Sequence, residues 1–188
     1  MTNTQWTDTQ WPRYEVFKQD KPGKRHEAVG SVHAPDAEIA LLMARDVFVR
    51  RPSAVSLWVV PANAIFAITR ENMDENPNWW VEDVSVSGQE RPFLIFTKTS
   101  QRRTMTYVQY TDTIYALSPK DALLKAMKSG SVDASQVWVW WVFAKEQIHQ
   151  SDPADAASFF DPANHKTYRQ QSYYGFVSPT RKKRGKSK

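Results

Sequence analysis

One structural pattern occurs twice in this chain of 188 residues, and the repetition limits the fold more than any other feature of the sequence. The matching segments are residues 14–17 with 93–96, residues 40–42 with 122–124, and residues 58–62 with 140–144, so that Trp58 is paired with Trp140. The offset is 79 for the first pair and 82 for the other two, which a longer hairpin loop in the second copy would explain. Because the matches fall on apolar positions that a common core would constrain, the sequence predicts an internal duplication.

Each copy shows the pattern of two strands, a helix and a third strand. In the first copy we expect these elements at residues 14–18, 26–33, 37–50 and 55–60. Asp36 and Ser118 are the expected N-caps of the two helices and occupy the same position in the repeat. The third strands, residues 55–60 and 137–143, are nearly continuous apolar runs, which is typical of inner strands buried on both faces. Since a helix separates the second strand from the third, we expect these two strands to run parallel with a right-handed crossover.

The first helix carries an unusually wide apolar surface. One stripe consists of Ile39, Leu42, Met43 and Val47, and it is widened sideways by Leu41, Ala44 and Phe48. We expect the stripe to cover the sheet. The additional width indicates a further contact, either with the other copy or with a partner protein.

These patterns predict an α+β fold of two ββαβ repeats packed as a pseudo-dimer, with sheets that carry one helix per repeat and an extended C-terminal arm. The expected parts are a first repeat at residues 11–71, a linker at 72–90, a second and divergent repeat at 91–150, an arm that docks on a partner at 151–180, and a disordered basic tail at 181–188.

The composition excludes several classes of protein. The sequence has no cysteine, which excludes disulfides, thiolate metal sites and a cysteine nucleophile. It has no apolar run long enough to span a membrane and no secretory signal pattern at its start, so we expect a cytoplasmic protein. Residues 181–188 (RKKRGKSK) hold six of the 25 basic residues, so the net charge of +5 comes from the tail and the rest of the chain is close to neutral.

Five segments, in order along the chain, resemble one protein family. They are residues 11–17 (WPRYEVF), 29–34 (VGSVHA), 40–51 (ALLMARDVFVRR), 56–60 (SLWVV) and 159–169 (FFDPANHKTYR). Together they look like the B subunit of phenylacetyl-CoA epoxidase. The second copy departs from this pattern, because TDTIYA at residues 111–116 replaces VGSVHA, and a usual member is about half as long. The chain is therefore identified as a fused tandem member of the family.

The resemblance implies a non-catalytic structural subunit. Members of the family resemble proteins that dimerise and bridge the catalytic di-iron subunit and its structural partner, in a multicomponent monooxygenase that epoxidises the aromatic ring of phenylacetyl-CoA in phenylacetate catabolism. Iron, reductase cofactors and substrate belong to the other subunits. We therefore expect no catalytic residue, metal or cofactor in this chain. Further self-association and a scaffold in another pathway stay open.

Thirteen residues are expected to contact the partner subunits. They combine the family-like face of the first copy with the aromatic and polar C-terminal arm: Tyr14, His33, Arg45, Arg50, Arg51, Phe159, Phe160, Asp161, Lys166, Tyr168, Arg169, Tyr173 and Tyr174. Large aromatic residues and Arg are the usual anchors of protein interfaces. For Arg50 and Arg51, and likewise for Arg102 and Arg103, an ordinary solvated surface fits the sequence equally well.

Candidate chemical groups are few. Glu146 and His149 have the Glu-x-x-His spacing of a di-iron ligand helix, but the motif follows a strand and has no second copy, so we expect a solvated loop there. His33 could serve as a general base oriented by Arg45 and Asp46. No nucleophile stands near it in the sequence, so a structural histidine at the end of a strand fits better.

Binding of RNA is the alternative function that the sequence leaves open. Residues 174–177 (YGFV) copy the centre of an RNA-recognition signature, Tyr107, Trp138 and Trp140 could stack on bases, and the tail is basic. The signature is incomplete, because Ser172 and Tyr173 stand where a basic residue and glycine are expected. Nucleic acid is therefore not the partner that we expect.

Overall fold

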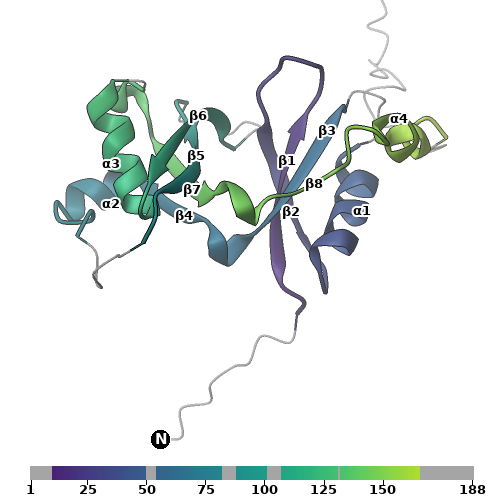
Figure 1. Cartoon of the computed structure of the whole chain (residues 1–188), viewed down its shortest axis with the longest axis horizontal. Helices are drawn as coiled ribbons and strands as arrows, with labels where there is room; N and C mark the ends of the chain where they lie inside the picture. The colour runs from purple at the N-terminus through teal and green to yellow at the C-terminus, as the bar shows by residue number, and fades with distance from the viewer. Residues whose placement is uncertain (1–9, 50–53, 82–87, 101–106, 131, 166–188) are drawn as a thin grey trace, which may run out of the picture.

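The computed structural model describes residues 10–49, 54–81, 88–100, 107–130 and 132–165. The fold is α+β, as predicted, with one eight-stranded antiparallel sheet in the order β4-β7-β5-β6-β2-β1-β3-β8 (Figure 1). The strands are β1 (Arg13–Gln19), β2 (Glu27–His33), β3 (Ser56–Pro61), β4 (Phe66–Thr69), β5 (Arg91–Lys98), β6 (Gln109–Ala116), β7 (Val139–Ala144) and β8 (His149–Gln150). The α-helices are α1 (Ala37–Phe48), α2 (Arg70–Glu75), α3 (Pro119–Ser129) and α4 (Ala156–Phe160), and the short 3-10 helices are η1 (Ala62–Ala64), η2 (Ala134–Gln136), η3 (Lys145–Gln147) and η4 (Asp161–Ala163).

Both predicted helix caps are present. The amide of Ile39 donates to the Asp36 carboxylate over 2.8 Å, and the amide of Asp121 donates to the Ser118 hydroxyl over 3.1 Å. β3 and β7 are inner strands, as predicted, each bordered by a short outer strand. β2 and β3 both run antiparallel to β1, so they have the same direction, but β1 lies between them. The helix connection therefore crosses over one strand instead of joining neighbours.

We call β1, β2, α1 and β3 the first half of the fold, and β5, β6, α3 and β7 the second half. The strand registers repeat from the first half to the second. A bulge falls between Val16 and Phe17 in β1 and between Ile95 and Phe96 in β5. Beside these bulges, Phe17 pairs with Trp58 and Phe96 pairs with Trp141. The ββαβ pattern thus occurs twice with the same pairing.

The prediction that Trp58 corresponds to Trp140 is wrong by one residue. The register makes Trp141 the equivalent of Trp58, and Trp140 the equivalent of Leu57. One extra residue between α3 and β7 shifts the offset, and the two adjacent tryptophans hide the shift in the sequence. A shift of one residue along a strand moves a side chain to the other face of the sheet. Trp140 accordingly lies in the core under α3, while Trp141 packs toward the other half.

A short strand that follows each half in the chain pairs with the sheet of the other half. β4 follows β3 in the chain through η1 but pairs with β7, where Phe66 lies opposite Val142. β8 follows β7 through η3 but pairs with β3, where His149 lies opposite Val59. These two pairings are equivalent in the repeat. Neither half therefore completes its own sheet.

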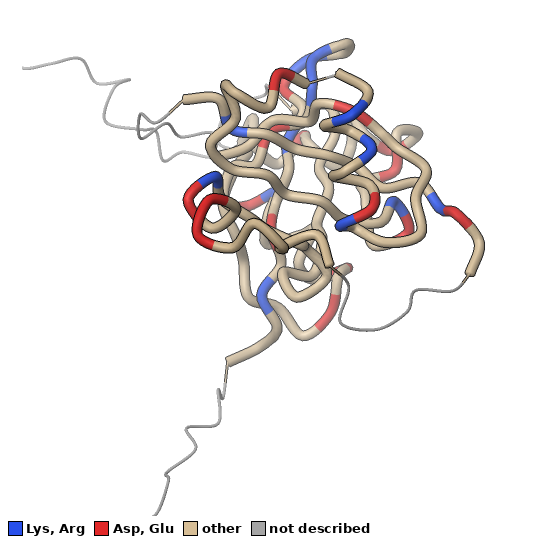
Figure 2. Tube along the Cα trace, turned by 90° about the vertical axis from the view of Figure 1, so that its left-hand side faces the viewer, with Lys and Arg blue, Asp and Glu red and all other residues tan. Residues whose placement is uncertain are grey.

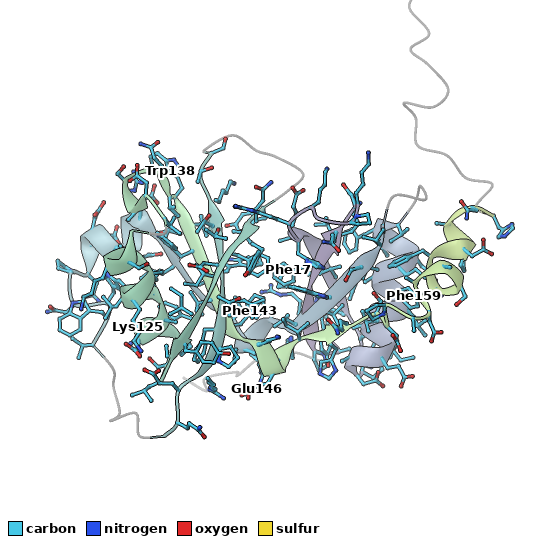
Figure 3. The ribbon with its side chains drawn as sticks, turned by 45° about the horizontal axis from the view of Figure 1, so that its top comes forward. Phe17, Lys125, Trp138, Phe143, Glu146 and Phe159 are labelled. Carbon is cyan, nitrogen blue, oxygen red and sulfur yellow. The ribbon has the colours of Figure 1, made fainter. Side chains whose placement is uncertain are left out.

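Three hydrophobic cores hold the layers together. One lies between α1, α4 and the strands of the first half, and the second lies between α3 and the strands of the second half. The third joins the two halves, and at its centre the ring of Phe17 lies 4.6 Å from that of Phe96 and 5.3 Å from that of Phe143 (Figure 3). Offset and tilted aromatic contacts at such distances stabilise a core beyond the area they bury.

β2 and β6 join the two halves at the middle of the sheet. Glu27 and Gln109 are directly opposite, and the Gln109 amide nitrogen donates to the Glu27 carboxylate over 2.7 Å. Backbone hydrogen bonds from Ala28 to Val108 and from Tyr110 to His26 flank this pair. Residues 27 and 109 occupy the same position in the repeat, so the contact lies where the two copies meet.

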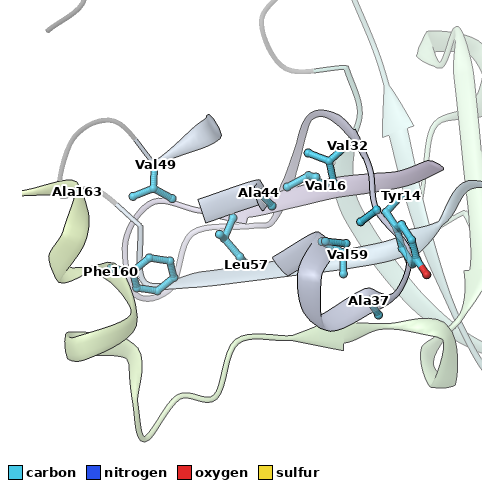
Figure 4. Packing of buried hydrophobic residues seen from close by; sticks show 12 residues of the cluster. Tyr14, Val16, Val32, Ala37, Ala44, Val49, Leu57, Val59, Phe160 and Ala163 are labelled. Carbon is cyan, nitrogen blue, oxygen red and sulfur yellow. The ribbon is translucent and has the colours of Figure 1, made fainter. Parts of the chain in front are cut away.

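The beginning of the C-terminal segment is helical and belongs to the first core, so the prediction of an extended arm is wrong for the part that the structure describes. α4 and η4 pack beside α1, and Phe160 and Ala163 are buried against Val49 and Leu57 (Figure 4). Residues 156, 159 and 160 lie on the side of this short helix that packs against the first core, and Phe160 is buried there. Residues 166–180 of the predicted arm lie outside the described residues.

Candidate partner interface

Three large apolar residues of α1, Ile39, Leu42 and Val47, face outward, opposite to the prediction from the sequence. Leu41, Met43 and Phe48 pack against the first core. The buried residues of α1 are Ala37, Ala40 and Ala44, whose small side chains let the helix lie close to the sheet. Ile39 and Leu42 are 37% and 38% exposed, and Val47 is 42% exposed. Because a wide outer surface is apolar although the core does not need it, this side of the first half is a candidate interface.

Trp11 is a further exposed apolar residue, and its backbone lies near the end where α1 begins. The Trp11 side chain is 58% exposed, just before β1. The Nδ1 atom of His33 lies 2.7 Å from the Trp11 carbonyl oxygen, and the Ala34 amide donates to the Pro12 carbonyl over 3.1 Å. These contacts fix residues 11 and 12 against the end of β2, which three residues separate from the start of α1.

Sequence reasoning missed Trp11, Ile39 and Leu42 as interface candidates. The signal was present in the excess width of the apolar stripe on α1. The assignment failed because Ile39 and Leu42 were expected inside, whereas the alanines of α1 are the residues buried against the sheet.

Two of the thirteen predicted contact residues are buried in the chain's own first core. Tyr14 and Phe160 are 8% and 6% exposed, so their role here is packing and their assignment to a partner interface is corrected. Seven others lie outside the described residues: Arg50, Arg51, Lys166, Tyr168, Arg169, Tyr173 and Tyr174.

Of the remaining four predicted residues, His33 and Asp161 are exposed, whereas Arg45 and Phe159 are partly buried. His33 is exposed at the end of β2. The Arg45 guanidinium lies 3.0 Å from the Asp46 carboxylate and 5.3 Å from the centre of the Phe159 ring, so it ties α1 to α4. Hydrogen bonds from Asn164 and His165 lower the pKa of Asp161, which keeps this carboxylate charged at the start of η4.

Glu146 and His149 do not form a ligand helix. Glu146 lies in η3, where its carboxylate pairs with Arg91, and His149 lies in β8, so the two do not share a helix face (Figure 3). Within the described residues, no group of three or more His, Cys, Asp or Glu side chains is placed to hold a metal ion.

His26 is a buried titratable group whose pKa is strongly lowered. It is 8% exposed, its ring stacks on Trp58 at 3.5 Å, and its Nε2 atom lies 3.1 Å from the Ser56 hydroxyl. Burial lowers the pKa of His26 to about 4. Its carbonyl oxygen also accepts the hydrogen bond from Tyr110 that joins the two halves.

Most of the aromatic residues proposed for stacking on RNA are buried or covered by another side chain. Trp140 is 1% exposed, and the Trp138 ring is covered by the Arg70 guanidinium at 4.6 Å. Tyr107 is exposed beside Lys98. Positive and negative residues are interspersed over the described trace (Figure 2). Residues 174–177 and the basic tail lie outside the described residues.

Comparison with known proteins gives the family. The family model for phenylacetic acid degradation B matches residues 10–85 and again residues 89–181. The chain belongs to this family. A curated relative, the B subunit of 1,2-phenylacetyl-CoA epoxidase from Escherichia coli (strain K12), is 48% identical over 65 residues, which are 35% of this chain and 68% of the relative. No solved structure matches the chain.

Membership in the phenylacetic acid degradation B family confirms the resemblance inferred from the five sequence segments. The two consecutive matches fit an internal duplication, which the repeated strand registers also indicate. No helix among the described residues is both long and apolar enough to cross a membrane.

Proposed function

We propose that this chain is a non-catalytic structural subunit of a multicomponent di-iron monooxygenase that epoxidises the ring of phenylacetyl-CoA during phenylacetate catabolism in the cytoplasm. It bridges the catalytic di-iron subunit and that subunit's structural partner. The observation that carries the proposal is the family match in two consecutive segments, because one chain then holds the sequence of two family members. The relative from Escherichia coli supports it, since its name places it in a complex of several subunits.

Under this proposal, residues 11–71 and 91–150 are two repeats that take the places of two protomers, joined by a linker at residues 72–90. The exchanged strands β4 and β8 support this arrangement, because each half completes the sheet of the other. Most closed assemblies of two identical units have a two-fold axis. Fusion raises the effective concentration of one half for the other to roughly the millimolar range, so the contact needs less intrinsic affinity.

Reconstitution tests the proposed function. The catalytic subunit and its structural partner are assayed with reductase and phenylacetyl-CoA, with and without this chain. We expect the chain to co-purify with the pair and to increase epoxidase activity, while the chain alone stays inactive. A catalytic pair that neither binds the chain nor responds to it would contradict the proposal.

Metal analysis of the purified chain gives a second, independent test. We expect less than about 0.1 equivalent of iron, since a ligated site would be near full occupancy. The side chains of Glu146 and His149 are the matched pair to change. Stoichiometric iron that is lost in Glu146→Gln and His149→Gln variants would overturn the non-catalytic assignment.

A further inference from the structure

The third core, which joins the two halves, is symmetric in only part of its residues. Its strands have the same registers in both halves, so each position in one half has an equivalent in the other. Some equivalent positions carry the same residue: Phe17 with Phe96, Trp58 with Trp141, and Ile65 with Ile148. These side chains give both halves the same shape over part of the junction.

Five other equivalent pairs at the junction differ, and they differ in one direction. The second half has the larger or the more apolar residue each time, and the first half has a smaller or a polar one. The pairs are Ala28 with Tyr110, Val60 with Phe143, Glu15 with Leu94, His26 with Val108, and Ser56 with Val139. The second half therefore supplies most of the bulk of the third core.

Phe143 fills the space between the two halves. Its ring lies 5.3 Å from the Phe17 ring of the first half and 5.3 Å from the Phe96 ring of its own half (Figure 3). The equivalent residue, Val60, is also fully buried but has no ring. One phenylalanine and one valine thus occupy two equivalent places. Because protein interiors are closely packed, two phenylalanines there would be too large and two valines would leave a void.

Tyr110 and Ala28 repeat this relation where β6 meets β2. The Tyr110 ring packs edge-on against Phe96 at 5.7 Å, and its hydroxyl lies 3.0 Å from the Thr113 hydroxyl. Ala28 is 1% exposed, and its amide donates to the Val108 carbonyl over 2.8 Å across the junction. Two second halves would bring two phenol rings to the junction, and two first halves would bring none.

We infer that the third core is a recognition surface that pairs a first half with a second half and rejects a pair of two like halves. Phe143 and Tyr110 would overpack a pair of second halves. A pair of first halves would have voids beside Val60 and Ala28. The partner that each surface fits is therefore the unlike half, from the same chain or from a second copy of it. This preference depends on the duplication alone, so it would hold in any complex that the chain joins.

Exchange of two residues within the intact chain tests whether they share one space. Val60→Phe and Phe143→Val are measured singly and together by urea unfolding. We expect each single change to lower the urea midpoint, and the double change to recover at least about half of the summed loss, because the total volume of the core is restored. Additive losses would show that the two positions do not fill a common space, and would overturn the inference.

Pairing of the halves tests the preference itself. A cleavage site for a specific protease is placed within residues 82–87, and the folded chain is cut, unfolded in urea and refolded as an equimolar mixture of its two pieces. Native mass spectrometry then measures the unlike and the like pairs. We expect more than about nine-tenths of the pairs to be unlike, against about one half for random pairing.

Two variants of the cut chain show which residues set the preference. Phe143→Val makes the second half resemble the first and should raise the share of like pairs at least about threefold. Ile148→Val is the matched control, because both halves have isoleucine at this position and its loss favours neither kind of pair. Random pairing of the wild type, pieces that separate and do not rejoin, or an equal shift with Ile148→Val would each overturn the inference. A failed reconstitution of the epoxidase would leave these outcomes unchanged.

Discussion

Acidification should weaken the junction between the two halves through His26. The pKa of His26 is lowered to about 4 in the folded chain, against about 6.5 in an unfolded one. Between these values the unfolded chain binds more protons than the folded chain, so stability falls as the pH falls. From pH 7 to pH 5 this difference in proton binding lowers the free energy of unfolding by the equivalent of about 1.3 pKa units, or roughly 2 kcal/mol.

Urea unfolding at pH 7, 6 and 5 measures this effect. Other groups titrate in the same range, and the pKa of Glu15 is raised by burial, which acts in the opposite direction as the pH falls. The comparison is therefore between wild type and His26→Gln, which retains a polar group near Ser56 but has no proton to gain. We expect wild type to lose about 2 kcal/mol more than the variant between pH 7 and pH 5. Parallel pH profiles for the two proteins would refute the assignment of a neutral, buried His26.

Three further predictions concern the cores. Gly30→Ala should destabilise the fold by at least about 1 kcal/mol, because Gly30 has a φ of +144° and an added Cβ would lie 2.7 Å from the Phe48 ring; an unchanged urea midpoint would contradict this. Phe143→Ala should cost about 3–5 kcal/mol in chemical denaturation, since Phe143 is fully buried between the halves, and a loss below about 1 kcal/mol would show that the halves do not depend on this core. Truncation after Gln150 should lower the melting temperature because it removes Phe160 from the first core; an unchanged melting curve would support an arm that is independent of the core.

The parts of the fold that could be predicted are those encoded by local patterns. Asp36 and Ser118 precede apolar helices and cap them as expected, and the apolar runs around Val59 and Val142 form inner strands. Such features depend on a few neighbouring residues, so one sequence is enough to read them.

The parts that could not be predicted depend on contacts between distant segments. β8 has two residues and β4 has four, too few for a periodic signal, and each pairs with a strand of the other half. The direction of α1 was missed for a similar reason. Its hydrophobicity favours Ile39 and Leu42 inside, but the buried positions of the helix are the alanines at 37, 40 and 44.

The same limit applies to the candidate interface. His33 and Arg45 were found on the surface of the first half, whereas Tyr14 and Phe160 serve the core. Aromatic residues suit an interface and a core equally well, and only the folded chain decides between the two. Trp11 is the opposite case, an aromatic residue that was not predicted at an interface but lies on the surface. Its exposure follows from the anchoring of residues 11 and 12 beside His33 and Ala34.

The hydrogen bond between Gln109 and Glu27 shows what a single chain permits that two identical chains do not. At a two-fold axis a residue meets its own copy, so a glutamate would face a glutamate and the two negative charges would repel each other. Within one chain the two positions mutate separately, and a donor can be set opposite an acceptor. The same holds for every position that would lie near such a two-fold axis, because in one chain a substitution changes only one of the two equivalent positions. Gene fusion thus turns a symmetric contact into one whose two sides can adapt to each other.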